Sequence, residues 1–269
     1  MNQLRLELSF KNLEELKRKI EFCLNNEINK INIPCKGVIK KEFLLDIVDY
    51  IGTNYNQLDV VYHYSLFHQF NRNKKISYTN FLNFIDKFKS YNSREILLIS
   101  GSRKKKEFDV INLFELLKND LNCKIDFGVA YNPYFYEKDQ IQLERERFVK
   151  KLNSNLVSSV WFQFGSDYKA LENEFEFINK QILKNKRISK KNIKIYGSLF
   201  IPSRQFLARF KFRPWRELFL SDKYLNSLEY SNRITRIIYD FYRKNNIKPL
   251  IESECSSINQ LKVLNKLLE

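Results

Sequence analysis

Eight short apolar segments alternate with longer amphipathic segments along the chain, and this alternation restricts the fold more than any other feature. Each short segment is followed by apolar residues at helical spacing. Such alternation is typical of parallel strands joined by right-handed crossovers, so the sequence predicts an α/β fold, a single (βα)8 TIM barrel over residues 1–269. A doubly wound open sheet is the alternative. The expected strands cover residues 3–9, 30–34, 59–66, 95–100, 124–130, 156–164, 193–200 and 247–251.

The charge balance is strongly basic. There are 47 Lys and Arg residues against 31 Asp and Glu residues, a formal net charge of +16. An excess of this size favours anionic partners such as phosphates, polyglutamate tails, nucleic acid or acidic membrane. The Lys-, Asn- and Ile-rich composition of an AT-biased genome explains the same excess without a function, and both readings stay open.

The expected cellular location follows from features that the sequence lacks. No run of about 18 apolar residues occurs, and the first residues are too charged for a signal peptide. The four cysteines are widely spaced, with no Cys-x-x-Cys pair and no zinc pattern with the two histidines. We therefore expect a cytoplasmic protein with no membrane partner and no bound metal.

In a barrel of this class the chemistry lies where the strands end. Glu7 stands between Leu6 and Leu8 in the first strand and points to the opposite face. At an interior position its carboxyl would lose hydration and its pKa would rise, which suits proton transfer. An ion pair with a neighbouring Lys or Arg is the structural alternative for Glu7.

Other strand ends carry further candidates. His63 lies among aromatic residues of the third strand, and Gly101 follows the fourth, just before the basic run 103–106. Tyr131 ends the fifth strand in an aromatic cluster, and Gln163 is a polar residue in the aromatic sixth strand. Gly lets a backbone approach a ligand closely, and an amide both donates and accepts hydrogen bonds.

Taken together, these motifs resemble the methylenetetrahydrofolate reductase family of flavin-dependent barrels. Leu6-Glu7-Leu8 stands where the family has a glutamate between two phenylalanines. The family's motifs in its third to sixth strands correspond, in order, to segments 62–65, 100–102, 129–133 and 162–164 of this chain. The resemblance covers nearly the whole chain, and each motif by itself is short.

The resemblance implies FAD-dependent reduction of 5,10-methylenetetrahydrofolate to 5-methyltetrahydrofolate with NAD(P)H. Glu7 would be the catalytic acid, and Gln163 would bind the folate substrate. The residues implied to bind the cofactor are His63, Gly101, Tyr131 and Lys150.

Several family motifs are altered, and Ser102 replaces the aspartate beside the flavin. Two alternatives therefore stay open: a repurposed barrel of the same family without this activity, and a basic nucleic-acid-binding protein, against which no RNA-recognition or helix-turn-helix signature is found. A homo-oligomer is a further possibility for the chain.

Overall fold

The computed structural model describes residues 4–35, 41–71, 73–91, 95–101, 108–118 and 125–269. Eight parallel strands follow one another in chain order in a closed barrel, so the predicted (βα)8 fold is confirmed. The contacts divide the chain into two compact units, Met1–Val129 and Ala130–Glu269, which we call unit 1 and unit 2. The expectation of one domain stays a prediction.

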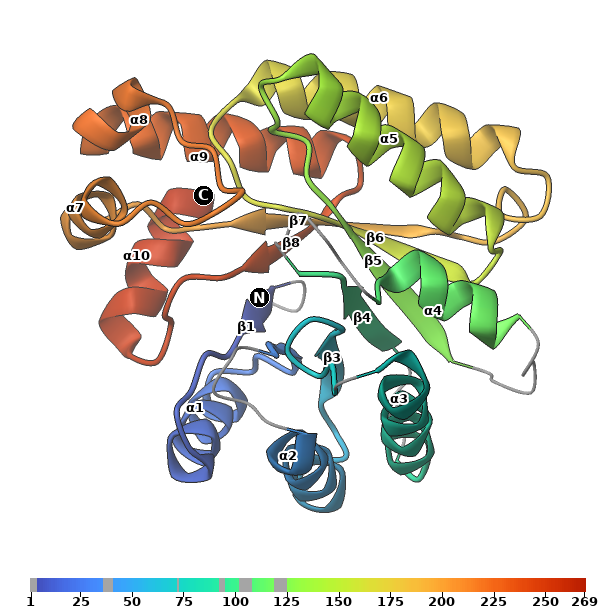
Figure 1. The fold of residues 1–269 in the computed structure, drawn as a ribbon. Coiled ribbons are helices and arrows are strands. Elements are labelled where there is room, and N and C mark those ends of the chain that lie inside the picture. Colours follow the sequence, from blue (N-terminus) through green and yellow to red (C-terminus); the bar gives the residue numbers. More distant parts are fainter. Residues whose placement is uncertain (1–3, 36–40, 72, 92–94, 102–107, 119–124) are drawn as a thin grey trace. The chain divides into compact units, whose positions relative to one another are not determined.

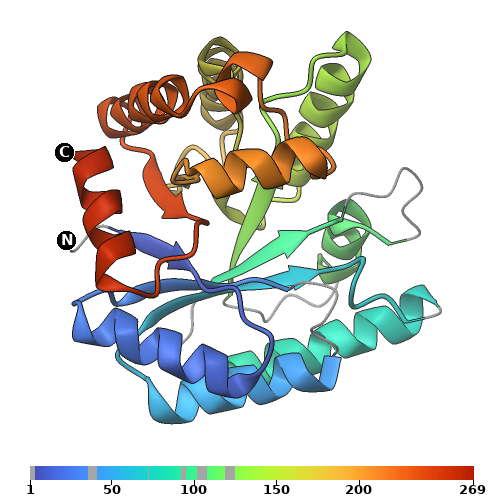
Figure 2. The ribbon, with the colours of Figure 1, turned by 90° about the vertical axis from the view of Figure 1, so that its left-hand side faces the viewer.

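Unit 1 contains four strand–helix pairs and the start of a fifth strand. The helices α1, α2 and α3 lie on the same side of strands β1 to β3 (Figures 1 and 2). The elements are β1 (Arg5–Glu7), α1 (Leu13–Asn25), β2 (Lys30–Ile33), α2 (Lys41–Asn54), β3 (Asp59–Ser65), α3 (Lys74–Lys89), β4 (Glu95–Ile99), α4 (Val110–Leu117) and β5 (Asp126–Tyr131).

Side-chain caps explain where the helices of unit 1 begin. The Asn12 side chain accepts a hydrogen bond from the backbone N–H of Glu15, and Asn73 caps α3 in the same way. Asp109 accepts from two backbone N–H groups at the start of α4. These side chains satisfy amide groups that have no partner within the helix.

The strand register of unit 1 places polar residues on one face. Glu7 pairs with Asn32, and Asn32 pairs with Val61, two residues before His63. Because side chains alternate along a strand, Glu7, Asn32 and His63 share a face. The opposite face is apolar and packs against the helices. Its fully buried members include Leu6, Ile31, Ile33, Tyr62 and Tyr64.

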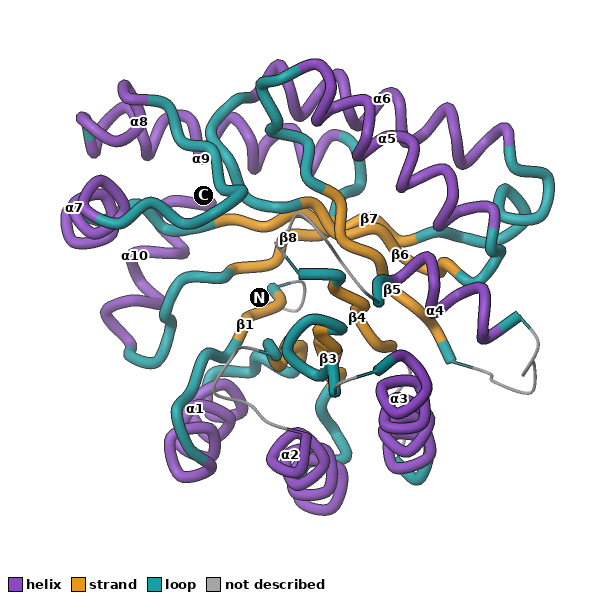
Figure 3. The backbone as a smooth tube through the Cα atoms, in the orientation of Figure 1, coloured by secondary structure: helices purple, strands orange, loops and turns teal. Residues whose placement is uncertain are grey.

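Unit 2 completes the strand–helix series and adds helices between β7 and β8 (Figure 3). Trp161 and Tyr196, on neighbouring strands, stack with ring centroids 3.8 Å apart and planes 6° apart. The elements are α5 (Lys138–Asn153), β6 (Val157–Phe162), α6 (Tyr168–Lys184), β7 (Lys194–Leu199), α7 (Arg204–Phe212), α8 (Asp222–Asn226), α9 (Leu228–Lys244), β8 (Lys248–Ile251) and α10 (Ile258–Leu268).

The chain between α7 and α8 differs from the sequence prediction. Apolar spacing predicts a helix over 214–226, but only Asp222–Asn226 is helical. Glu217 has a φ of 61°, in the left-handed region, which a right-handed helix cannot include. Leu218 packs into a separate core cluster with Phe164, Phe200 and Phe210. Tertiary packing therefore overrides the local pattern here.

No helix in the described part of the chain is long and apolar enough to cross a membrane.

Candidate active site

A chain of polar side chains crosses the first three strands of unit 1. Arg5 donates from Nη2 to Oδ2 of Asp59 at 2.6 Å and from Nη1 to the carbonyl of Ile31 at 3.0 Å. The same Nη1 lies 3.3 Å from Oδ1 of Asn32, whose Nδ2 lies 2.8 Å from Nε2 of His63. Arg5, Asn32 and His63 are all at most 5% exposed. The strands thus hold this chain rigidly away from water.

The hydrogen bond from Arg5 to Asn32 determines which nitrogen of neutral His63 carries the proton. A guanidinium only donates hydrogen bonds, so the Asn32 oxygen faces Arg5 and its amide N–H faces His63. Nε2 of His63 therefore accepts a hydrogen bond, and the neutral imidazole carries its proton on Nδ1. The Nδ1–H group would interact most favourably with a carboxylate, and a carboxyl group lies nearby.

Glu7 provides that carboxylate. Its Oε2 lies 3.9 Å from Nδ1 of His63, and the two side chains are 9% and 6% exposed. The separation is longer than a hydrogen bond, so the two groups are close neighbours without a direct bond between these two atoms. The structure therefore brings together two of the sequence-predicted residues, Glu7 and His63, as a carboxyl–imidazole pair. The catalytic role of Glu7 stays a prediction.

Gly101 lies in the same unit, just beyond β4. Strands β3 and β4 pair Ser65 with Ile99, so Gly101 follows the strand next to the one that bears His63. Its φ of 83° is in the left-handed region, and a Cβ there would lie 2.4 Å from Cβ of Phe67. Glycine is required by this backbone conformation and this contact. Ser102 and the basic run 103–106 lie outside the described residues.

The other predicted residues belong to unit 2. Tyr131 is 1% exposed and donates its hydroxyl to Glu174, to which Arg145 also donates at 2.6 Å. Burial, and then the bond to Glu174, raise the pKa of Tyr131 far above its usual range. Lys150 is exposed on α5, and Gln163 is half-buried, its Oε1 accepting from the backbone N–H of Phe164. These placements leave the predicted binding roles untested.

Sequence reasoning overlooked Arg5, Asn32 and Asp59. A signal for two of them was present: Arg5 alternates with Leu6 as Glu7 does, and Asn32 separates Ile31 from Ile33. A polar residue between two buried apolar ones in a strand faces the other side. Asp59 begins its strand and gave no comparable signal.

Cys35 lies two residues after the end of β2. It is 6% exposed and accepts a hydrogen bond from Nε2 of Gln69 at 3.3 Å. Burial raises the pKa of its thiol. Since the thiolate is the reactive form, Cys35 has the environment of a structural cysteine.

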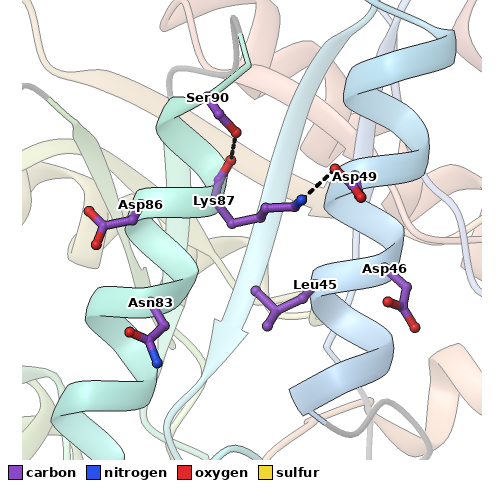
Figure 4. Close-up of a pocket in the computed structure, with 7 residues that line it drawn as sticks. All are labelled: Leu45, Asp46, Asp49, Asn83, Asp86, Lys87 and Ser90. Atoms are coloured by element: carbon purple, nitrogen blue, oxygen red, sulfur yellow. Dashed lines mark hydrogen bonds and ion pairs between the residues drawn. The ribbon is translucent and has the colours of Figure 1, made fainter.

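A surface pocket lies elsewhere in unit 1, between α2 and α3 (Figure 4). Lys87 crosses it and forms a 2.6 Å ion pair with Asp49. The bonds from Lys87 and then from Tyr91 lower the pKa of Asp49. The pocket is lined by Leu45, Asp46, Asp49, Asn83, Asp86, Lys87 and Ser90. It lies on the outer helices, away from the strand ends where barrel enzymes carry their chemistry.

Comparison with known proteins finds the fold but no family. No family model matches the chain, and no curated protein matches it. A thermostable aldo-keto reductase, Tm1743, has a TM-score of 0.55 at 11% identity over 99% of this chain and 89% of its own. The catalytic domain of a chitinase from Pyrococcus furiosus has a TM-score of 0.54 at 10% identity, over 94% and 84%. An aldo-keto reductase from Klebsiella pneumoniae in complex with NADPH has a TM-score of 0.50 at 9% identity, over 99% and 85%.

These findings correct the family assignment. The expected membership of the methylenetetrahydrofolate reductase family is wrong, because no family model matches and the similar structures include aldo-keto reductases and chitinases. The expected flavin-dependent reduction of a folate is wrong with it, as is the repurposed member of that family, and FAD has no support. The physical reason is that polar residues at the strand ends are common to (βα)8 enzymes, so their order along the chain identifies the architecture and no family within it.

Proposed function

We propose that this chain is an NAD(P)H-dependent oxidoreductase that reduces an aldehyde or a ketone. The observation that carries the proposal is the pairing of Glu7 with His63, whose imidazole is oriented by Asn32. Structural neighbours with TM-scores of 0.50 to 0.55 include aldo-keto reductases, one of them in complex with NADPH. A cytoplasmic location, a small-molecule substrate and a homo-oligomer belong to the same proposal.

Reduction of a carbonyl to an alcohol needs a hydride at carbon and a proton at oxygen. NAD(P)H, when bound, supplies the hydride. In this proposal Glu7 gives the proton, since a carboxyl group is an ordinary general acid and an imidazole lies beside it. The Nδ1 proton of His63 then stabilises the carboxylate that remains, and Asn32 holds the ring in that tautomer.

The chemistry of unit 1 fits such a cofactor at the end of β4. Gly101 has no side chain and a left-handed backbone, so its peptide can approach a ligand closely. Gly101 would hold the cofactor in this proposal. His63 would orient the acid and would not touch the cofactor.

The chitinase neighbours suggest glycoside hydrolysis as the competing activity. That reaction uses two carboxyl groups on either side of the bond that is cleaved. Beside Glu7 lies the imidazole of His63, which the amide of Asn32 orients. A second buried carboxyl group, Glu95, lies in the same row of strand residues as Glu7. The oriented imidazole next to Glu7 favours proton delivery to a single oxygen, and the activity assay below separates the two reactions.

The test begins with binding and then measures turnover. Isothermal titration calorimetry should show that NADPH binds the protein, and a panel of aldehydes and ketones should drive the loss of absorbance at 340 nm. Glu7→Gln should bind NADPH as tightly as the parent and turn over about 10²- to 10⁴-fold more slowly, the usual contribution of a general acid. Glu14→Gln, an exposed position on α1, is the matched control and should be fully active.

Two results would reject the proposal. One is a folded protein that binds neither NADH nor NADPH. The other is hydrolysis of chito-oligosaccharides that is lost in Glu7→Gln, which would assign the site to glycoside cleavage.

A further inference from the structure

The last two residues of α7 and the five that follow have an unusual surface. All seven residues 211–217, which we call the tip, are exposed. Phe212 is 91% exposed, and none of the ring contacts found among the described residues involves it. A phenylalanine in this position gains nothing from the fold of its own unit, so the burial that it can gain must come from outside.

The ring of Trp215, also in the tip, is held by three aromatic rings of unit 2. It contacts Phe200, Phe206 and Phe210 with centroids 5.4, 5.9 and 6.0 Å away and planes 63–67° apart. The ring is nevertheless 47% exposed. Phe210 belongs to the core cluster of unit 2, so the tryptophan is held rigidly with about half of its surface facing water. Three residues span at most about 10 Å, so Phe212 and Trp215 are neighbours.

Five exposed cations lie on α7 and the tip: Arg204, Arg209, Lys211, Arg213 and Arg216. None of the five forms an ion pair with any residue that the structure describes. Residues 204–217 contain a single acid, Glu217. The tip therefore combines unpaired positive charge with exposed aromatic surface.

We propose that the tip docks the protein onto the surface of an anionic lipid membrane. Arg and Lys attract acidic headgroups, while Trp and Phe partition into the boundary between headgroups and acyl chains. An exposed run of consecutive residues at the end of a helix can enter that boundary. Single-stranded nucleic acid binds instead along grooves with rows of stacking rings, whereas the tip presents two exposed rings, Phe212 and Trp215.

Such docking is peripheral. The sequence led us to expect no membrane partner because the chain lacks an apolar span, and no described helix is able to cross a bilayer. A tip that enters the headgroup region needs no span, since its backbone stays at the water interface. The net charge of +16 acts in the same direction.

The test uses the full chain and sedimented vesicles. Vesicles of phosphatidylcholine with about a third phosphatidylserine should carry down the protein at low salt, and vesicles of phosphatidylcholine alone should not. Binding should fall as salt rises, because the charges are screened. Phe212→Ala should weaken the partition constant about tenfold, and Arg213→Gln with Arg216→Gln by a similar factor.

Matched controls lie on α6 and just after it, in the same unit. Leu183 is 74% exposed, so Leu183→Ala removes a comparable apolar side chain away from the tip. Lys186→Gln with Arg187→Gln removes two exposed charges, as the tip variant does. Both controls should bind the vesicles as the parent does. Thermal unfolding checks that every variant is folded, which is expected because the substituted side chains are exposed.

Three results would overturn the proposal. The first is a parent protein that does not bind acidic vesicles at low salt. The second is binding that Lys186→Gln with Arg187→Gln weakens as much as the tip variants do, since the effect would then be general charge. The third is tip-dependent binding of a single-stranded RNA oligonucleotide, followed by fluorescence anisotropy, by a protein that ignores vesicles. NADPH binding is measured separately, so failure here and failure of the proposed reductase activity are distinguishable.

Discussion

Asn32 donates its side-chain N–H to Nε2 of His63 over 2.8 Å, and this bond determines which nitrogen of the imidazole carries the proton. The amide is itself oriented by Arg5, which can only donate. Arg5 is thus connected to Glu7 through Asn32 and His63. The polar face of β1 to β3 is therefore one connected unit, and changes at one end should be felt at the other.

The tautomer of His63 is the first prediction. Long-range proton–nitrogen NMR spectra should show neutral His63 with its proton on Nδ1, because Nε2 accepts from Asn32. Asn32→Leu should remove this preference and shift the His63 nitrogen signals. His68, exposed in the loop after β3, is the internal control and should keep its signals. An Nε2-protonated His63 in the parent would contradict the assigned amide orientation.

The second prediction concerns Arg5. Arg5 is 3% exposed and donates to Asp59, to Ile31 and to Asn32. Arg5→Met should lower the free energy of unfolding by about 2–3 kcal/mol, because buried acceptors lose a charged donor. Asp59→Asn keeps an acceptor and alters a side chain that is 56% exposed, so it should cost at most about 1 kcal/mol. Equal costs for the two variants, measured by urea unfolding, would show that the ion pair and not the buried bonds carries the effect.

The third prediction is a pH dependence at the α2–α3 pocket (Figure 4). Lys87, followed by Tyr91, lowers the pKa of Asp49, and Asp49 in turn raises the pKa of Lys87. A depressed carboxyl pKa stabilises the folded state above the unfolded pKa of about 4, and the contribution is lost as pH falls through the folded value. Asp49→Asn should therefore be less stable than the parent at pH 7 and equal to it in strong acid.

The control for that pH dependence lies on the same pocket. Asp86 is exposed on α3 and forms no ion pair among those found in the described chain. Asp86→Asn should leave the urea midpoint unchanged at both pH values. A stability difference for Asp49→Asn that persists in acid would mean that the amide disturbs packing, and the proposed linkage would fail.

The fourth prediction is a close approach in unit 2. A Cβ on Gly197 would lie 2.2 Å from Cζ of Tyr242, a fully buried ring. Gly197→Ala should lower the free energy of unfolding by about 1–3 kcal/mol, because the core there has no space. Tyr242→Leu removes the ring atoms that clash, so the double variant should lose less than the sum of the single losses. Additive losses would place the cost of Gly197→Ala elsewhere.

Much of the fold was predictable because it depends on local periodicity. The spacing of Leu16 and Ile20 defines the buried face of α1, and Asn12 fixes its start. The segment 214–221 was not predictable in the same way. Its apolar residues have helical spacing, but Leu218 and Leu220 pack into the cluster around Phe164, a contact between segments far apart in sequence.

The candidate site was predictable only in part. Glu7 and His63 were both selected from the sequence, because each is a polar residue in an otherwise apolar strand. Their partnership was not, since it depends on the register that pairs Glu7 with Asn32 and Asn32 with Val61. The family assignment failed for a related reason: short motifs at strand ends recur in unrelated barrels.

The sequence by itself determined the alternation of strands and helices, and hence the (βα)8 architecture, because hydrophobic period and helix caps act over a few residues. Only the tertiary structure decided that Arg5, Asn32 and His63 are joined and that Phe212 is left in water. Hydrogen bonds between strands and the exposure of a side chain depend on residues distant along the chain, and no local pattern records where those residues lie.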